Sequence, residues 1–179
     1  AITYPADGHD TNAAWIPLTG TVTDNFDTPT YLVYSINGTD TVGIESAAWD
    51  TGLMLPADTS IITVGCSDAA GNWAQTSITV TCDTTAPVVA ITYPADGHDT
   101  NAAWIPLTGT VTDNFDTPAY LWYSINYTDT VVIDNNTWDT GLALPAETSI
   151  LTVGCTDGAG NWAQTSITVA CDTTAPVVA

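Results

Sequence analysis

The chain is built from two nearly identical halves. Residues 1–89 match residues 90–178 at 75 of 89 positions without a gap, and ten of the 14 substitutions fall between Thr30 and Asp58. A period of 89 residues is too long for a solenoid repeat and fits one small β-sandwich. We therefore expect one domain in 1–89 and a second in 90–179, joined around 83–90. Because residue 179 returns to the phase of residues 1 and 90, the halves also read as two periods of a longer array, although a protein of two repeats fits as well.

Short runs of β-branched and aromatic residues follow one another along each half. In the first half these runs fall at 1–4, 17–24, 31–36, 42–44, 48–55, 61–67 and 74–82. Segments rich in Gly, Asn, Asp and Pro separate them, as in turns between strands. In the last run Ile78, Val80 and Cys82 alternate with threonines, which is typical of a half-buried strand. The pattern predicts an all-β fold, with two tandem immunoglobulin-like β-sandwich domains of about seven strands each.

The chain has no basic side chain. It carries 20 acidic residues and no Lys or Arg, which gives a formal charge of −20. Such a polyanion lacks the basic surface that binds nucleic acid or anionic lipid. The sequence also contains no run of about 18 apolar residues, so it predicts no helix inserted into a membrane. An apolar content of 45% argues against disorder. A cation from outside the chain must therefore balance its carboxylates.

Four motifs of the first half occur together. They are Pro-Ala-Asp-Gly at 5–8, Leu-Thr-Gly-Thr-Val-Thr-Asp at 18–24, Ile-Thr-Val-Gly-Cys-Ser-Asp-Ala-Ala-Gly-Asn-Trp at 62–73 and Asp-Thr-Thr-Ala-Pro-Val-Val at 83–89. Together they resemble bacterial immunoglobulin-like (Big-type) tandem repeats of cell-surface adhesins and extracellular filaments. The resemblance covers both halves. It implies secretion, tandem stacking and a role in adhesin stalks or as an accessory module of secreted glycosidases. The missing Lys and Arg and the cysteines depart from that family.

Acidic turns gather at the domain ends if the strands follow the immunoglobulin order. The linker then brings Asp83 to the end of the second domain that also carries the turn with Asp113 and Asp116 and the hairpin with Asp157. At about 4 Å each carboxylate pair repels by roughly 4 kcal/mol at an effective dielectric of about 20. Oxygen ligands on turns suit Ca²⁺ better than zinc. We therefore predict Ca²⁺ at the repeat junction.

The predicted ligands recur with the repeat. The first set comprises Asp83, Asp113, Asp116 and Asp157, the equivalents in the first domain are Asp24, Asp27 and Asp68, and Asp172 would serve a following repeat. The alternative is that these residues are ordinary turn-forming aspartates, solvated and screened by salt.

Each half has two cysteines, Cys66 and Cys82 in the first and Cys155 and Cys171 in the second. A hairpin turn at 70–71 places Cys66 opposite Gln75, and Cys82 then lies about 23 Å farther along at roughly 3.3 Å per residue. A disulfide needs Cα atoms within about 7 Å, so Cys66 and Cys82 do not pair. Three alternatives stay open: a Cys82–Cys155 bridge between repeats, four free thiols, or a link within one repeat through an unexpected topology.

No residue pattern predicts an enzyme. His9 and His98 occur once per half in a Gly-His-Asp turn, without partners for a triad or a zinc site, and we expect them to be surface turn residues. The chain also lacks a Gly-x-Ser-x-Gly motif. Asn37, Asn126 and Asn135 begin glycosylation acceptor triplets.

Tryptophans are the remaining candidates for recognition. We expect Trp15, Trp49, Trp104 and Trp138 to pack in the core or along strand edges. Trp73 and Trp162 follow a Gly-Asn turn and either pack at the core or junction or stack on sugar.

The sequence as a whole favours a structural function outside the cell. We expect an extracellular, cell-surface repeat protein, a segment of a stalk or filament that is stiffened by end-to-end domain stacking and calcium. Its partners would be neighbouring repeats or identical subunits. The alternative is a carbohydrate-binding accessory module of a secreted or surface protein, with glycans as ligands.

Overall fold

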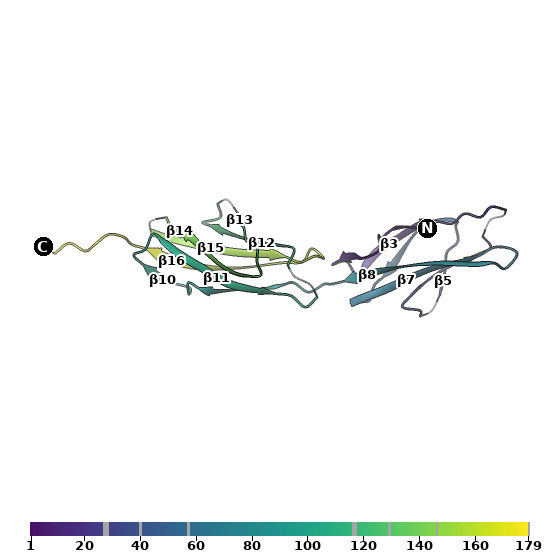
Figure 1. Cartoon of the computed structure of the whole chain (residues 1–179), viewed down its shortest axis with the longest axis horizontal. Helices are drawn as coiled ribbons and strands as arrows, with labels where there is room; N and C mark the ends of the chain where they lie inside the picture. The colour runs from purple at the N-terminus through teal and green to yellow at the C-terminus, as the bar shows by residue number, and fades with distance from the viewer. Residues whose placement is uncertain are drawn as a thin grey trace. The chain divides into compact units, whose positions relative to one another are not determined.

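The computed structural model describes residues 1–26, 29–39, 41–56, 58–115, 118–128, 130–145 and 147–178. These residues form two compact units, Ala1–Thr84 and Thr85–Ala179. All regular elements of the described residues are β-strands, coloured from purple to yellow along the chain in Figure 1. Accordingly, this part of the chain contains no helix that could span a membrane.

The first unit is a sandwich of two sheets. One sheet has the order β1-β3-β6 and the other the order β2-β8-β7-β4-β5. The strands are β1 (Ile2–Tyr4), β2 (His9–Thr11), β3 (Trp15–Thr21), β4 (Tyr31–Ile36), β5 (Val42–Gly43), β6 (Ala48–Met54), β7 (Asp58–Ser67) and β8 (Trp73–Cys82). Between the sheets lies a core of buried aliphatic residues around Leu18, Ile62 and Val80, each 0% exposed.

The second unit repeats this architecture. Its sheets have the orders β14-β11-β9 and β10-β16-β15-β12-β13. The strands are β9 (Val88–Tyr93), β10 (His98–Thr100), β11 (Trp104–Thr112), β12 (Tyr120–Ile125), β13 (Val131–Val132), β14 (Thr137–Ala143), β15 (Glu147–Thr156) and β16 (Trp162–Cys171). The predicted all-β class with two immunoglobulin-like sandwiches is confirmed.

The last two strands of each unit, β7 with β8 and β15 with β16, form a long antiparallel hairpin. In β7 the buried Ser60, Ile62 and Val64 alternate with more exposed residues, whereas the first five residues of β8 are all exposed. The backbone N–H of Asp68 donates to the carbonyl of Asn72 and closes the turn between the two strands. Gly65 lies opposite Gln75, so the predicted pairing of Cys66 with Gln75 is wrong by one residue. Cys82 lies opposite Asp58, at the far end of the hairpin from Cys66.

An eighth strand was not predicted in either unit. Residues 9–11 form β2, which pairs in parallel with β8 and places His9 beside Val80. His9 is half-buried, and its Nε2 lies 3.2 Å from the hydroxyl of Tyr4. His98 makes the same contact with Tyr93 in the second unit. The two histidines are therefore strand residues, and the prediction that they lie in surface turns is wrong.

Tryptophans occupy two different environments. Trp49 and Trp138 are buried in the cores, 6% and 3% exposed, as predicted. Trp15 and Trp104 are 59% and 63% exposed and cover glycines of the neighbouring strand, so they pack along a strand and lie outside the core. Because a glycine has no side chain, the indole ring can lie flat against the backbone of the next strand.

Candidate metal centre

Two predicted calcium ligands meet at one end of the second unit. Asp113 follows β11 of one sheet, and Asp157 follows β15 of the other. A carboxylate oxygen of Asp113 lies within 4.8 Å of a carboxylate oxygen of Asp157, and Asp157 is 3% exposed. The fold therefore brings together two acids that are 44 residues apart in the sequence.

Hydrogen bonds hold both carboxylates in their turns. Asp157 accepts from the backbone N–H and from the side-chain Nδ2 of Asn161, each at 2.8 Å. Asp113 accepts from the backbone N–H of Phe115 at 3.1 Å. These contacts are those of turn-forming aspartates. A carboxylate offers about four lone-pair positions, so the same groups keep the capacity to bind a cation.

The negative charges of Asp113 and Asp157 affect the pKa of a buried thiol, that of Cys155. Cys155 lies on β15 and is 1% exposed. Desolvation by burial, together with the smaller effects of the negative charges of Asp113 and Asp157, raises the pKa of Cys155 to about 11. The thiol therefore stays protonated at neutral pH and does not offer a thiolate ligand. The remaining donors are carboxylate oxygens, and such ligands suit Ca²⁺ better than Zn²⁺.

The first unit contains the equivalent pair. Asp24 and Asp68 line one small cavity of about 120 Å³ together with Cys66. Asp68 accepts from the side chain of Asn72 at 2.6 Å and from its backbone N–H at 2.8 Å. These hydrogen bonds, with the side-chain bond the strongest, lower the pKa of Asp68. Asp24 accepts from the backbone N–H of Phe26 at 3.1 Å.

The other predicted ligands lie directly after the last strand of each unit. The backbone N–H of Asp83 donates to the carbonyl of Thr11. Asp172 accepts from the backbone N–H of Thr174 at 2.8 Å and lines a cavity of about 430 Å³ with Asp99. Asp27 and Asp116 lie outside the described residues.

All four cysteines are free thiols in the structure. Cys82, Cys155 and Cys171 are buried, whereas Cys66 is half-buried. The Sγ of Cys171 lies 3.7 Å from the carbonyl oxygen of Ala102, a contact that suits a thiol donor. Burial of this kind is typical of cysteines that act as small apolar residues.

The candidate recognition residues on the surface are exposed. Trp73 and Trp162 are 52% and 61% exposed, so neither packs in a core, while packing at a junction and stacking on sugar both stay predictions. The ring of Trp73 covers Gly65, but in the second unit Trp122 covers the equivalent Gly154.

The three acceptor asparagines are also exposed. Asn37 and Asn126 follow β4 and β12 with positive φ angles of 53° and 52°. The side-chain oxygen of each accepts a backbone hydrogen bond of 2.8 Å, from Ile61 and Ile150 respectively.

Sequence reasoning missed the pairing of tryptophan with glycine. Glycines within strand-like runs, such as Gly52 and Gly141, are the signal that could have indicated it, because glycine weakens a strand unless something packs against it.

Comparison with solved structures supports the fold. The fibronectin(III)-like modules of Clostridium thermocellum CbhA match with a TM-score of 0.58 and 13% identity, over 96% of this chain and 93% of that one. The FN1–FN3 domains of chicken CNTN1 match with a TM-score of 0.45 and 12% identity, over 95% and 66% of the two chains. A structure from a 1.5-MDa bacterial ice-binding adhesin matches with a TM-score of 0.45 and 18% identity, over 88% and 58%. The likeness to the CbhA modules shows the fold alone.

A protein-family model identifies the family to which this chain belongs. No curated protein matches this chain. The model described as "Glucodextranase, domain B" matches residues 1–84 and 87–173, almost all of both units. The predicted resemblance is therefore confirmed for tandem immunoglobulin-like domains, and the matching family model does not specifically support the Big type. The chain belongs to the Glucodextranase domain B family.

Proposed function

We propose that the chain is a structural module of an extracellular protein, a segment of a cell-surface stalk or filament in which successive domains are stiffened by bound Ca²⁺. The observation that carries this proposal is the recurrence of one acidic pair at the same end of two nearly identical sandwiches. Identical ends give identical attachment points, which suits a regular array. The partners are neighbouring repeats or identical subunits, and the role is not enzymatic.

Electrostatics supports the calcium site. Asp113 and Asp157 lie within 4.8 Å of each other, and no Lys or Arg exists to neutralise them. Asp83 is the natural further ligand because it stands only five residues before β9, the strand that opens the second unit. A divalent cation between these acids removes a repulsion of roughly 4 kcal/mol per close pair.

Calcium titration tests the site directly. We expect Ca²⁺ to raise the thermal midpoint and a chelator to reverse the rise. In the Asp113→Asn/Asp157→Asn variant we expect calcium binding to weaken by at least about tenfold, which corresponds to about 1.4 kcal/mol. Asparagine keeps one oxygen, which can accept the backbone N–H bond of each turn, and loses the bond from the side chain of Asn161, so the variant should still fold.

Asp139→Asn is the matched control, because Asp139 is exposed on β14. This variant should bind calcium as the original chain does. An unchanged midpoint with and without calcium in the original chain would contradict the proposed site.

A covalent connection between repeats stays a prediction as well. Alkylation under denaturing conditions without a reductant should modify all four cysteines if they are free thiols, whereas a Cys82–Cys155 bridge would leave these two unmodified until they are reduced. The burial of three of the four thiols supports the free-thiol alternative.

The second candidate is a carbohydrate-binding accessory module. Trp162 supports it because its ring is 61% exposed, and exposed aromatic faces stack on sugars. The family name refers to an enzyme that acts on glucans, so a soluble glucan is the first ligand to test. Binding that is lost in Trp162→Ala and kept in Trp104→Ala would favour this function.

A mass increase at Asn126 in protein from the native source would show that a glycan is covalently attached there.

A further inference from the structure

Three aromatic side chains lie on the outer face of the five-stranded sheet in the second unit, the side away from its core. In β12, Leu121 belongs to the core. Side chains alternate along a strand, so Tyr120 and Trp122 point to the outer side. Trp162 of β16 lies on the same side, because Thr156 of β15 pairs with Tyr120 and with Trp162.

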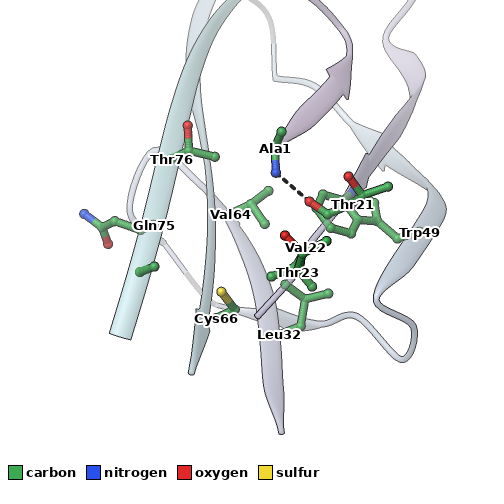
Figure 2. A pocket seen from close by; sticks show the side chains of 11 residues that line it. Ala1, Thr21, Val22, Thr23, Leu32, Trp49, Val64, Cys66, Gln75 and Thr76 are labelled. Carbon is green, nitrogen blue, oxygen red and sulfur yellow. Dashed lines mark hydrogen bonds between the residues drawn. The ribbon is translucent and has the colours of Figure 1, made fainter. Parts of the chain in front are cut away.

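The first unit shows the same division between a core side and an outer side. In Figure 2, Gln75 of β8 points away from Leu32 and Val64, which belong to the core. Its equivalent in the second unit is Gln164, which lies opposite Gly154. The outer faces of the two units therefore correspond position by position.

One substitution between the repeats changes this outer face. Residue 33 is Val in the first unit, and the equivalent residue 122 is Trp. In the first unit the ring of Trp73 covers Gly65 and lies 6.4 Å from the ring of Tyr31. Val33 beside them is 6% exposed. Trp73 therefore lies against the sheet in the first unit.

In the second unit Trp122 takes this place. Its ring covers Gly154, and Thr152 in the next row of the outer face is only 2% exposed. Because Trp122 occupies the glycine, Trp162 is left more open than its equivalent Trp73, with 61% of its side chain exposed against 52%.

Tyr120, Trp122 and Trp162 together are named the aromatic platform. Tyr120 and Trp162 lie two strands apart, at about 10 Å from the usual strand spacing. Trp122 lies two residues along β12 from Tyr120, at about 7 Å from the usual rise per residue. Tyr120 is 43% exposed and Trp122 is half-buried. The platform therefore offers three ring faces over a length that suits an extended ligand.

The strands around the aromatic platform carry no charge on their outer side. The structure describes every residue of β12, β13, β15 and β16, and the outward positions hold only aromatic, aliphatic, hydroxyl and amide side chains and one glycine. In the fifth strand, β10, Asp99 lies beside Ala170, about 26 Å along β16 from Trp162. A chain with a charge of −20 thus keeps a neutral surface here. Such a surface complements an uncharged partner, whereas the rest of the chain repels a polyanion.

We propose that the aromatic platform of the second unit binds an uncharged, extended polysaccharide, a β-1,4-linked glucan. The C–H groups of a glucose ring form an apolar face that stacks on an aromatic ring. The hydroxyl groups at the edge of the ring exchange hydrogen bonds with Thr156 and Gln164. A β-1,4-linked chain is a flat ribbon that can lie along three rings, whereas an α-linked chain coils. This inference rests on the second candidate function, the carbohydrate-binding module, and names its binding face and its ligand class.

Native electrophoresis in gels that contain hydroxyethyl cellulose tests the platform. We expect the polymer to retard the chain, and Trp122→Val to weaken binding by at least about tenfold. This variant should fold, because Val33 stands at the same position of the first unit. Trp104→Ala is the matched control: Trp104 is 63% exposed on the other sheet of the same unit, so binding should remain. A chain that hydroxyethyl cellulose does not retard, or two variants with equal effects, would overturn the inference.

The reciprocal substitution tests whether Trp122 creates the platform. Val33→Trp should displace Trp73 from Gly65 and give the first unit the same three rings. Calorimetric titration with cellohexaose should then show two sites per chain in the variant and one in the original. A variant that keeps a single site would contradict the role given to Trp122.

The charge argument has its own control. Carboxymethyl cellulose has the same backbone as hydroxyethyl cellulose but carries carboxylates, so we expect it not to retard the chain. Equal retardation by the two polymers would contradict a preference for uncharged partners. Dimers of the chain that Trp122→Val dissociates would show that a second copy occupies the platform, and would overturn the proposal.

Dextran, an α-linked glucan, separates this inference from the candidate function on which it rests. Retardation by dextran alone, lost in Trp162→Ala and kept in Trp122→Val, overturns the platform and leaves a carbohydrate-binding module in place. A chain that no polysaccharide retards overturns both. Calcium titration decides the structural function independently of either result.

Discussion

At the scale of single residues, tryptophan and glycine act as pairs. Six tryptophans lie against glycines of their own unit: Trp15 on Gly52, Trp49 on Gly20, Trp73 on Gly65, Trp104 on Gly141, Trp122 on Gly154 and Trp138 on Gly109. Glycine normally weakens a strand because it has no side chain to pack. Here the indole ring covers the bare backbone, so a glycine inside a strand and a nearby tryptophan form one packing unit.

We expect Gly109→Ala to destabilise the second unit by about 1–3 kcal/mol, as overpacking of a core does. An added Cβ would meet the backbone oxygen of Ala90 and the ring of Trp138, which is 3% exposed. Neither group can move away easily. Urea unfolding measures the change. Gly43→Val is the control: apart from its own and the adjacent residues, no heavy atom lies within 4 Å of its Cβ position, and Val132 stands at the equivalent position of the second half. Equal losses in both variants would contradict this account.

At the scale of elements, local sequence patterns were sufficient to predict some strands but not others. The alternation in 74–82 predicts β8 because the burial of a strand has a period of two. Strand β2 has three residues, His-Asp-Thr, and pairs with β8, about 70 residues away in the chain. Such a strand is made by tertiary contacts, so nothing in its own residues indicates it. The acidic pair was predictable because strand order alone brings Asp113 and Asp157 to one end.

The loop between β9 and β10 is attached to β16 through one carboxylate. Asp96 accepts from the backbone N–H and from the hydroxyl of Thr168, each at 2.8 Å. These bonds, the backbone bond first, lower the pKa of Asp96 below 3.8. Its ionised form therefore stabilises the fold above that pH, and this contribution is lost as the pH falls through the lowered pKa.

We expect Asp96→Asn to make the stability of the second unit less dependent on pH in the acid range. Urea unfolding at a series of pH values measures this. Asp139→Asn serves as the control for this pH dependence, because Asp139 is exposed on β14. A variant whose acid limb is as steep as that of the original chain would refute the assignment to Asp96.

At the scale of the whole molecule, the charge of −20 is the dominant property. The 20 Asp and Glu side chains all carry negative charge and no Lys or Arg opposes them, so any compact state brings like charges together. The hydrophobic cores of the two units must offset this repulsion. An external cation therefore acts on stability in two ways, by general screening and by binding at particular carboxylates.

Matched salts separate these two effects. Added NaCl should raise the thermal midpoint, because screening shortens the range of repulsion to about 10 Å at 0.1 M. MgCl₂ and CaCl₂ at equal ionic strength screen alike, but Mg²⁺ requires a near-octahedral shell and keeps its waters, whereas Ca²⁺ accepts carboxylates in flexible geometry. We therefore expect CaCl₂ to raise the midpoint further than MgCl₂, and the Asp113→Asn/Asp157→Asn variant to remove only that excess. Equal midpoints in the two divalent salts would mean that the −20 charge is balanced by a diffuse ion atmosphere, and the turns would then be ordinary aspartate turns.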